Sequence, residues 1–408
     1  MSKIVEIKLD NAAYGGESIG RLPDGRAVFV PFGIPGETVR IKIVVDKKKF
    51  ARGELLEVLE SSPSRVSARC PHYLECGGCH YQHIAYEQQL LIKQKVLRDQ
   101  LERIGRLAQP PIESVVPSPN HFNYRNQVKF QINRSGKLGF VRANKQGVLE
   151  ITECHLPELA LTSIFHLLEI DPDSRLSGLG LRLGIEDDVL VTLESKYRFD
   201  AEFDIQTLPV SVVHISPELT EVLAGSEYTV VQVKDRQFRV SAGSFFQVNS
   251  ALAEQMLDRI ESALPAEPGL VLELYSGVGL FSAFIASRTG KLVSIEASES
   301  AADDFEYNLD EFNNVDLYLG PVEDILPDLY LKPDVVLADP PRTGLHKRAV
   351  EYLISVKPKS LIYISCDPST LARDSKLLTE AGYNAQEFIP FDFFPQTYHI
   401  ETLSIWKT

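Results

Sequence analysis

The chain has few cysteines, no long apolar run and no heptad repeat. No apolar segment approaches the length of a membrane span, and residues 1–8 lack the apolar core of a signal peptide. These two absences predict a cytoplasmic protein without a membrane anchor. Only five of the 408 residues are cysteines, and in a cytosolic chain such a set favours metal binding over disulfide bonds. Without heptads there is no sign of a coiled-coil partner, so a monomer is expected.

Charged residues are distributed unevenly along the chain. The net charge of −14 by itself argues against a polyanionic partner. However, residues 1–150 contain 23 Lys and Arg against 15 Asp and Glu, whereas the remaining residues contain 19 against 41. A basic N-terminal part is typical of a protein that binds something acidic, although an excess of this size equally suits an ordinary solvated surface. Length and composition predict two or three globular domains.

Residues 1–60 read as five short strands separated by turns. The alternating segments are residues 5–9, 18–22, 27–30, 38–45 and 54–59. This pattern predicts a small closed barrel of the OB type, which is a frequent RNA-binding scaffold. Lys47, Lys48, Lys49 and Arg52 lie near its last turn, where they can contact phosphates. A barrel without a ligand is the alternative. The pattern resembles the TRAM domain of RNA-modifying enzymes.

Four of the cysteines form one set. Cys70, Cys76 and Cys79 have the spacing C-x5-C-x2-C, and Cys154 follows 75 positions beyond Cys79. Four thiolates suit zinc or an iron–sulfur cluster. Structural zinc more often uses two C-x2-C pairs, so three clustered ligands with a distant fourth favour a cluster. On these residues alone, zinc is the alternative ligand.

Residues 61–240 are predicted to form a central, mixed β-rich domain. Residues 85–106 have the periodicity of an amphipathic helix, which we expect to pack on the C-terminal domain. Residues 123–150 read as a sheet with basic and aromatic residues interleaved, a pattern that suits single-stranded RNA. This predicted RNA surface consists of Arg125, Lys129, Arg134, Lys137, Arg142 and Lys145 with Phe122, Tyr124 and Phe130. Ordinary strand faces are the alternative.

From residue 241 the pattern changes to alternating strands and helices, which predicts a doubly wound α/β sheet. The strand 270–274 runs into a turn at Gly277 that holds only part of the G-x-G-x-x-G pattern. The next strand ends at Glu296, and an acid there can accept hydrogen bonds from ribose hydroxyls. NAD and S-adenosylmethionine both fit these features. Asp339-Pro-Pro after the fourth strand favours the methyl donor, with a simple rigid turn as the alternative.

Cys366 follows a short apolar strand, residues 361–365, and precedes a predicted helix. It is therefore expected at the carboxyl end of a strand, where α/β sheets bind their ligands. The start of a helix, capped by Ser369 or Thr370, favours the thiolate form of a nearby cysteine. A buried structural cysteine is the alternative. Glu401 lies just before the last strand and can face the same pocket, although taken alone it suits a surface or satisfied polar group.

A methyl donor beside a strand-end thiolate points to methylation of carbon 5 of a pyrimidine. Carbon 5 is a poor nucleophile until a thiolate adds to carbon 6 and converts the ring into an enolate. A base then removes the proton from carbon 5, and the thiolate leaves. Cys366 is the expected nucleophile and Glu401 the expected base. A paired or stacked target must be flipped out of its helix.

Taken together, these motifs resemble the RNA (uracil-5-)-methyltransferases that carry a TRAM domain and a 4Fe–4S cluster. The resemblance covers essentially the whole chain. Its motifs are the four-cysteine set, Ser244-Phe-Phe-Gln247-Val-Asn, Glu273-Leu-Tyr275-Ser-Gly277-Val-Gly, Asp339-Pro-Pro-Arg, Ser365-Cys366-Asp-Pro and His399-Ile-Glu401. It implies a Rossmann-like class I methyltransferase domain at residues 241–408, behind the barrel and the central domain.

The resemblance also implies the ligands and roles of individual residues. Cys366 attacks uracil and Glu401 takes the proton. S-adenosylmethionine is bound at Gln247, Tyr275, the turn at Gly277, Glu296 and Asp339. Cys70, Cys76, Cys79 and Cys154 hold a structural 4Fe–4S cluster. The substrate is ribosomal or transfer RNA, with ribosomal RNA preferred. Leu280 and Pro321 depart from the polar residues found in relatives, so no side-chain contact to the cofactor is expected there.

A cytosine-5 methyltransferase shares the thiol but usually pairs it with a different acid and a different order of motifs. Two further functions fit parts of the pattern. The Asp-Pro-Pro turn also suits an exocyclic-amine methyltransferase, whose chemistry needs no thiol. A non-catalytic RNA-binding protein can keep the same fold. Activity that depends on Cys366 would distinguish uracil methylation from both.

Overall fold

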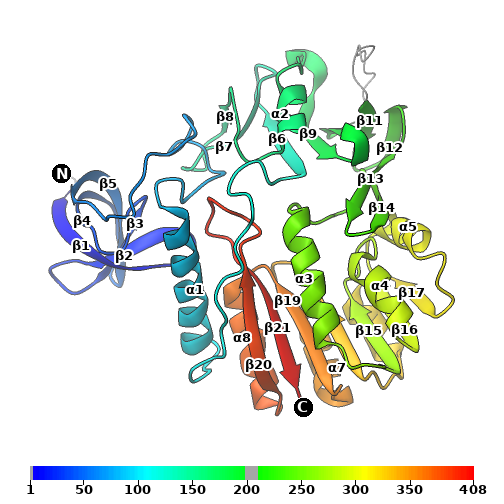
Figure 1. Ribbon diagram of the computed structural model, residues 1–408. Helices are drawn as coiled ribbons and strands as arrows, with labels where there is room; N and C mark the ends of the chain where they lie inside the picture. Colours follow the sequence, from blue (N-terminus) through cyan, green and yellow to red (C-terminus); the bar gives the residue numbers. More distant parts are fainter. Residues whose placement is uncertain (1–2, 198–209) are drawn as a thin grey trace.

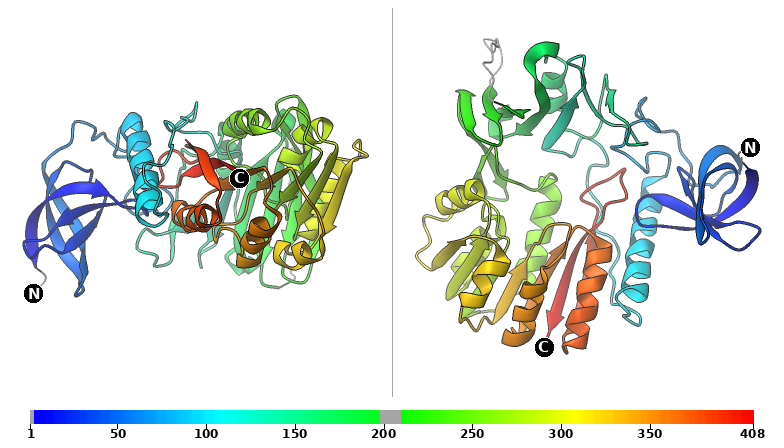
Figure 2. Two further views of the ribbon diagram at one scale, coloured as in Figure 1. Left: turned by 90° about the horizontal axis from the view of Figure 1, so that it is seen from below. Right: turned by 180° about the vertical axis from the view of Figure 1, so that it is seen from behind.

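The computed structural model describes residues 3–197 and 210–408. Within these residues the chain forms a closed barrel, a central sheet, a two-stranded ribbon and a C-terminal sheet (Figure 1). Helix α1 (Tyr86–Arg103) lies between the barrel and the C-terminal sheet in all three views (Figures 1 and 2). No helix in the described ranges is long and apolar enough to cross a membrane.

The predicted barrel is confirmed. Its strands are β1 (Ile4–Ala12), β2 (Glu17–Arg21), β3 (Ala27–Pro31), β4 (Thr38–Asp46) and β5 (Phe50–Glu60), in the order β1-β2-β3-β5-β4. Alternate residues point inward, and Leu9, Val28 and Ile41 are fully buried. The turn between β4 and β5 leaves Lys47, Lys48 and Lys49 exposed.

The central sheet has the strand order β12-β11-β10-β9-β6-β7-β8. Its elements are β6 (Gln127–Ile132), β7 (Leu138–Val141), β8 (Val148–Glu150), α2 (Leu159–Phe165), β9 (Leu176–Leu183), β10 (Val189–Ser195), β11 (Val210–Ile215) and β12 (Thr220–Ala224). Single 3-10 turns follow α2 and β9 at Pro172–Ser174 and Ile185–Asp187. The ribbon of β13 (Tyr228–Val233) and β14 (Arg236–Ser241) follows this sheet.

The predicted RNA surface of the central sheet is only partly present. Tyr124 and Phe130 are 4% and 1% exposed, so these two aromatic rings belong to the core and are not available for stacking on bases. Lys129 is paired with Glu194 at 2.7 Å. The alternation of the strand was read correctly, but Phe130 packs in a buried cluster with Phe165 of α2. The Tyr124 hydroxyl donates a hydrogen bond to the main-chain oxygen of Pro395 (3.2 Å).

The C-terminal sheet has the strand order β17-β16-β15-β18-β19-β21-β20, with β21 antiparallel to its neighbours. Its elements are α3 (Ser250–Ala263), β15 (Leu270–Leu274), α4 (Leu280–Ile285), β16 (Lys291–Glu296), α5 (Glu299–Asn308), β17 (Val315–Leu319), α6 (Val322–Ile325), β18 (Val335–Ala338), α7 (Lys347–Val356), β19 (Ser360–Ser365), α8 (Pro368–Glu380), β20 (Asn384–Phe391) and β21 (Glu401–Lys407). Two further 3-10 turns lie at Ala286–Arg288 and Leu326–Asp328. The predicted Rossmann-like architecture is confirmed.

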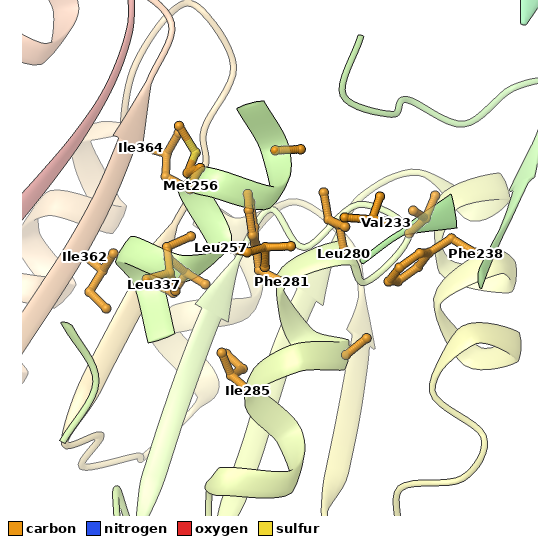
Figure 3. Packing of buried hydrophobic residues seen from close by; sticks show 14 of the residues in the cluster. Val233, Phe238, Met256, Leu257, Leu280, Phe281, Ile285, Leu337, Ile362 and Ile364 are labelled. Atoms are coloured by element: carbon orange, nitrogen blue, oxygen red, sulfur yellow. The ribbon is translucent and has the colours of Figure 1, made fainter. Parts of the chain in front are cut away.

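Helices cover both faces of this sheet. On one face α3 and α4 pack on the strands through Met256, Leu257 and Phe281 (Figure 3). On the other face, Leu97 and Leu101 of α1 share a core cluster with α8. Strands buried on both faces read as continuous apolar runs, which is why these strands are almost wholly hydrophobic.

A buried ion pair ties α1 to the loop that joins β20 and β21. Lys93 Nζ lies 2.5 Å from Asp392 Oδ1, and the two side chains are 1% and 0% exposed. Lys93 also donates to the main-chain oxygen of Phe394 (3.1 Å). Since buried charges are costly unless paired, this contact strongly disfavours any separation of α1 from the loop.

Candidate active site

The predicted site residues follow neighbouring strands at one edge of the C-terminal sheet. Tyr275, Glu296, Asp339 and Cys366 lie at the carboxyl ends of β15, β16, β18 and β19. Because β21 runs in the opposite direction, Glu401 at its start lies at the same edge. The strand order reverses between β15 and β18, which is where open α/β sheets bind their ligands. Figure 1 shows this edge of the sheet facing the central domain.

Cys366 lies in the turn between β19 and α8. The helix begins at Pro368, so its N-cap is Asp367, whose Oδ1 accepts hydrogen bonds from the amides of Ser369 (2.8 Å) and Thr370 (3.0 Å). The prediction that Ser369 or Thr370 caps the helix was wrong by two or three residues, because proline is readily accommodated as the first helical residue.

Glu401 lies next to Cys366, because β19 and β21 are neighbouring strands of the sheet. Ser365 of β19 pairs with Thr402 of β21, so the antiparallel register continued by one residue sets Cys366 opposite Glu401. The Glu401 side chain is buried at 5% exposure. Strand pairing thus brings together two residues that are 35 positions apart in the sequence.

Burial and two carboxylates hold the Cys366 thiol in its protonated form. Burial, followed by the charges of Glu401 and Asp339, raises the pKa of Cys366 to about 12, while Arg342 acts in the opposite direction. The expectation that the helix start favours the thiolate was therefore wrong for the free protein. Burial also raises the pKa of Asp339 to about 7 and holds the pKa of Glu401 well above its usual range.

The glycine turn after β15 leaves room for a ligand. Gly277 has φ +56°, and a Cβ added there would meet nothing within 4 Å. By contrast, a Cβ on Gly279 would come within 2.3 Å of Leu309, so Gly279 is needed for packing. The Gly277 amide donates to Glu296 Oε2 (2.8 Å). The turn and the acid are therefore adjacent, as a nucleoside-binding site requires.

Tyr275 and Gln247 are two further predicted cofactor residues, and Tyr275 belongs to this turn. Tyr275 has φ +63°, and burial raises the pKa of its hydroxyl to about 12. Gln247 is 9% exposed just before α3, and its main-chain oxygen accepts a hydrogen bond from Asn126 Nδ2 (2.9 Å). The open cradle at Gly277 and the adjacent carboxylate of Glu296 fit the ribose and amino-acid parts of S-adenosylmethionine.

The sequence did not single out Glu273 as a buried charge within β15. Its side chain is 1% exposed, Oε2 accepts hydrogen bonds from Ser282 and Ser294, and Oε1 has no hydrogen-bond partner. Burial raises the pKa of Glu273 to about 8. The sequence feature that could have identified it is an acidic residue inside the apolar run Leu270–Leu274, because a glutamate is rarely buried in such a strand without a partner.

The four clustered cysteines line one cavity, away from Cys366. Cys70, Cys76, Cys79 and Cys154 surround a space of about 250 Å³ together with Arg125. Burial raises the pKa of Cys79 to about 12 and that of Cys154 to about 11, and the negative charges of the neighbouring cysteine thiolates contribute in the same direction. Within the described ranges, no three His, Cys, Asp or Glu residues are arranged around a single metal ion. Soft sulfur donors around a cavity far larger than one ion fit a multi-iron cluster.

The fold agrees with comparisons to known proteins. The family model of the TRAM domain matches residues 2–56, and that of the tRNA (uracil-5-)-methyltransferases matches residues 193–319 and 321–407. The chain belongs to the tRNA (uracil-5-)-methyltransferase family. It is therefore an RNA methyltransferase.

Relatives extend this assignment over the full length. An uncharacterized RNA methyltransferase of Aquifex aeolicus is 33% identical over 99% of this chain and 98% of its own. A second one, from Synechocystis, is 32% identical over 99% and 96%. The crystal structure of Pyrococcus abyssi tRNA (uracil-54, C5)-methyltransferase with S-adenosyl-L-homocysteine is 26% identical, with a TM-score of 0.75 over 98% of this chain and 99% of that one.

Leu280 and Pro321, the two positions without a polar side chain, have different structural roles. Leu280 is 6% exposed and lies in the core beside Val233 and Phe238 (Figure 3). Pro321 occupies the N-cap of α6, where a preset backbone suits the helix start. Neither position therefore offers a side-chain hydrogen bond to the methyl donor.

Proposed function

We propose that this RNA methyltransferase modifies carbon 5 of a uridine through a covalent bond between Cys366 and carbon 6. The observation that carries the proposal is the placement of Cys366 opposite Glu401, with Asp339 beside them, at the ligand-binding edge of the sheet. A thiol and a carboxyl at the ends of two neighbouring strands suit addition to a ring carbon and removal of a proton from its neighbour.

Each residue has a distinct task in this mechanism. S-adenosylmethionine, when bound, supplies an electrophilic methyl group. The Cys366 thiolate adds to carbon 6, and the electron pair of the ring double bond makes carbon 5 nucleophilic. Glu401 accepts the proton of carbon 5 after methylation, the double bond re-forms, and the sulfur–carbon bond breaks. Both groups act in their ionised forms, so Arg342, which favours ionisation of both, is expected to support the reaction.

Transfer RNA and ribosomal RNA are the two candidate substrates. The sequence expectation preferred ribosomal RNA, whereas the structural neighbour from Pyrococcus abyssi is a tRNA enzyme that modifies uridine 54. We take transfer RNA as the first candidate and ribosomal RNA as the second. Exposed Lys47, Lys48 and Lys49 of the barrel support binding to either, since phosphate contacts do not depend on sequence.

The proposal is tested with RNA in which 5-fluorouridine replaces uridine. Fluorine on carbon 5 cannot leave as a proton, so the Cys366–RNA bond is expected to persist after methyl transfer. Intact mass should show protein, RNA and one methyl group, on transfer or ribosomal RNA but not both. The Cys366→Ala variant is the control and should form no complex. An enzyme that methylates both RNAs without a trapped complex would favour an exocyclic amine as the target.

We further propose that the four-cysteine cavity holds a 4Fe–4S cluster, with a structural role. Anaerobically purified protein is expected to contain about four iron atoms and four sulfides per chain. Cys79→Ser should lose the iron and the visible absorbance, because it removes a buried ligand, whereas Cys366→Ala should keep both. One zinc per chain without visible absorbance would contradict the assignment. The reduced thiols that both sites need are maintained in the cytoplasm, where we place the enzyme.

A further inference from the structure

The hairpin between β1 and β2 carries the barrel into contact with the catalytic region. Gly15 and Gly16 in this hairpin have φ of +110° and +87°, which side chains rarely allow. A Cβ on Gly16 would lie 3.1 Å from His80 Cβ and 3.2 Å from Tyr398 Cδ1. The two glycines therefore permit both the tight turn and a close approach to the loop that precedes Glu401.

Tyr14 at the tip of this hairpin binds the residue next to the nucleophile. Its hydroxyl donates to Asp367 Oδ2 (2.9 Å), across 353 positions of sequence. The other oxygen of Asp367 caps α8, so both carboxylate oxygens are engaged. The ring of Tyr14 also packs edge-on against Tyr398, with centroids 5.5 Å apart. The position of the Cys366–Asp367 turn thus depends on a contact from the barrel.

A shared core extends the contact to the segment that directly precedes Glu401. Ile34 of the barrel, Ile92 and Val96 of α1 and Ile400 belong to one buried cluster. Ile34 and Ile400 are 0% and 1% exposed, and Ile400 directly precedes Glu401. The barrel therefore packs against the segments that carry both reactive groups.

We propose that the barrel is a structural part of the active site and that Tyr14 is a positioning residue, which acts through Asp367 on Cys366. The inference rests on the proposed role of Cys366 as the nucleophile. A barrel that binds RNA and also holds the catalytic turn keeps the substrate and the nucleophile in one rigid frame, which reduces the entropy lost in reaching the reactive geometry.

The hydrogen bond also affects the charge around the thiol. Cys366 faces Glu401 from β21, Asp339 and Arg342 from the segment after β18, and Asp367 from its own turn. The negative charge of Asp367 disfavours the thiolate, and the Tyr14 hydroxyl offsets part of that charge by donating to it. Loss of this donor should therefore make Cys366 less reactive, whereas simple exposure of the site would make it more reactive.

Tyr14→Phe tests the proposal because it keeps the ring and removes only the donor. We expect kcat for methylation to fall about tenfold, as for loss of a hydrogen bond to a charged group, and KM for RNA to change by less than about twofold. Alkylation of Cys366 in the free holoenzyme, followed by peptide mass spectrometry at fixed pH, should slow about threefold. Tyr383→Phe is the matched control, since it removes a buried hydroxyl that donates to the Leu353 carbonyl (2.8 Å) far from the turn.

A double-mutant cycle with Asp367→Asn completes the test. Asparagine can still cap α8, but its amide nitrogen cannot accept from Tyr14, so the two substitutions should be strongly non-additive in kcat. An unchanged kcat, a rise in KM alone, or faster alkylation in Tyr14→Phe would each overturn the inference. Failure of the wild-type enzyme to form the 5-fluorouridine complex would instead overturn the proposed function, so the two failures are distinguishable.

Discussion

Substitution of Cys366 by alanine is expected to abolish RNA methylation, with a loss on the order of 10⁴-fold or more. Without addition to carbon 6, carbon 5 of uracil is not nucleophilic, and the four other cysteines all line a separate cavity that does not include Cys366. Incorporation of labelled methyl groups into RNA measures the loss. Binding of S-adenosylmethionine, measured by calorimetry, should be retained because Gly277 and Glu296 are untouched.

The same variant separates the proposed reaction from its main rival. Cys366 is half-buried in a turn and outside the main hydrophobic clusters, so its truncation should leave the melting temperature nearly unchanged. An exocyclic-amine methyltransferase would retain its activity in Cys366→Ala. Retained methylation by a folded variant would therefore show that Cys366 is structural.

Replacement of Glu401 by glutamine is expected to stop the reaction after methyl transfer. Glutamine has nearly the same size and cannot accept the proton of carbon 5, so the methylated Cys366–RNA adduct should accumulate on ordinary RNA. Turnover should fall about 10³-fold, in the range for loss of a general base. Gel electrophoresis under denaturing conditions and intact mass would detect the adduct, and single-turnover experiments should show one methyl group per enzyme.

The pH dependence of the wild-type enzyme provides an independent check. Burial raises the pKa of both Cys366 and Glu401, and both must lose a proton to act. Turnover by the wild-type enzyme should therefore rise with pH through the neutral range. If Glu401→Gln forms no adduct at any pH, Glu401 serves to ionise the thiol and is not the base for carbon 5.

Local patterns in the sequence were sufficient to predict the fold and to place the candidate site residues at one edge of the sheet. Alternation over short segments predicts the barrel because one face of each strand must be buried. The switch to apolar strands and amphipathic helices predicts the doubly wound sheet. In such a sheet the carboxyl ends of parallel strands meet at one edge, so Glu296, Asp339 and Cys366 could be brought together without knowledge of the structure.

The tertiary structure decided what depends on groups that are remote in the sequence. The helix start near Cys366 predicted a thiolate, but burial and the carboxylates of Glu401 and Asp339 outweigh it. Tyr124 and Phe130 have the spacing of a stacking surface, yet both rings are buried, and Phe130 packs against α2. The hydrogen bond from Tyr14 to Asp367 has no signal in either segment, because it depends on how the barrel docks. Periodicity is a local property, whereas desolvation and docking depend on the whole chain.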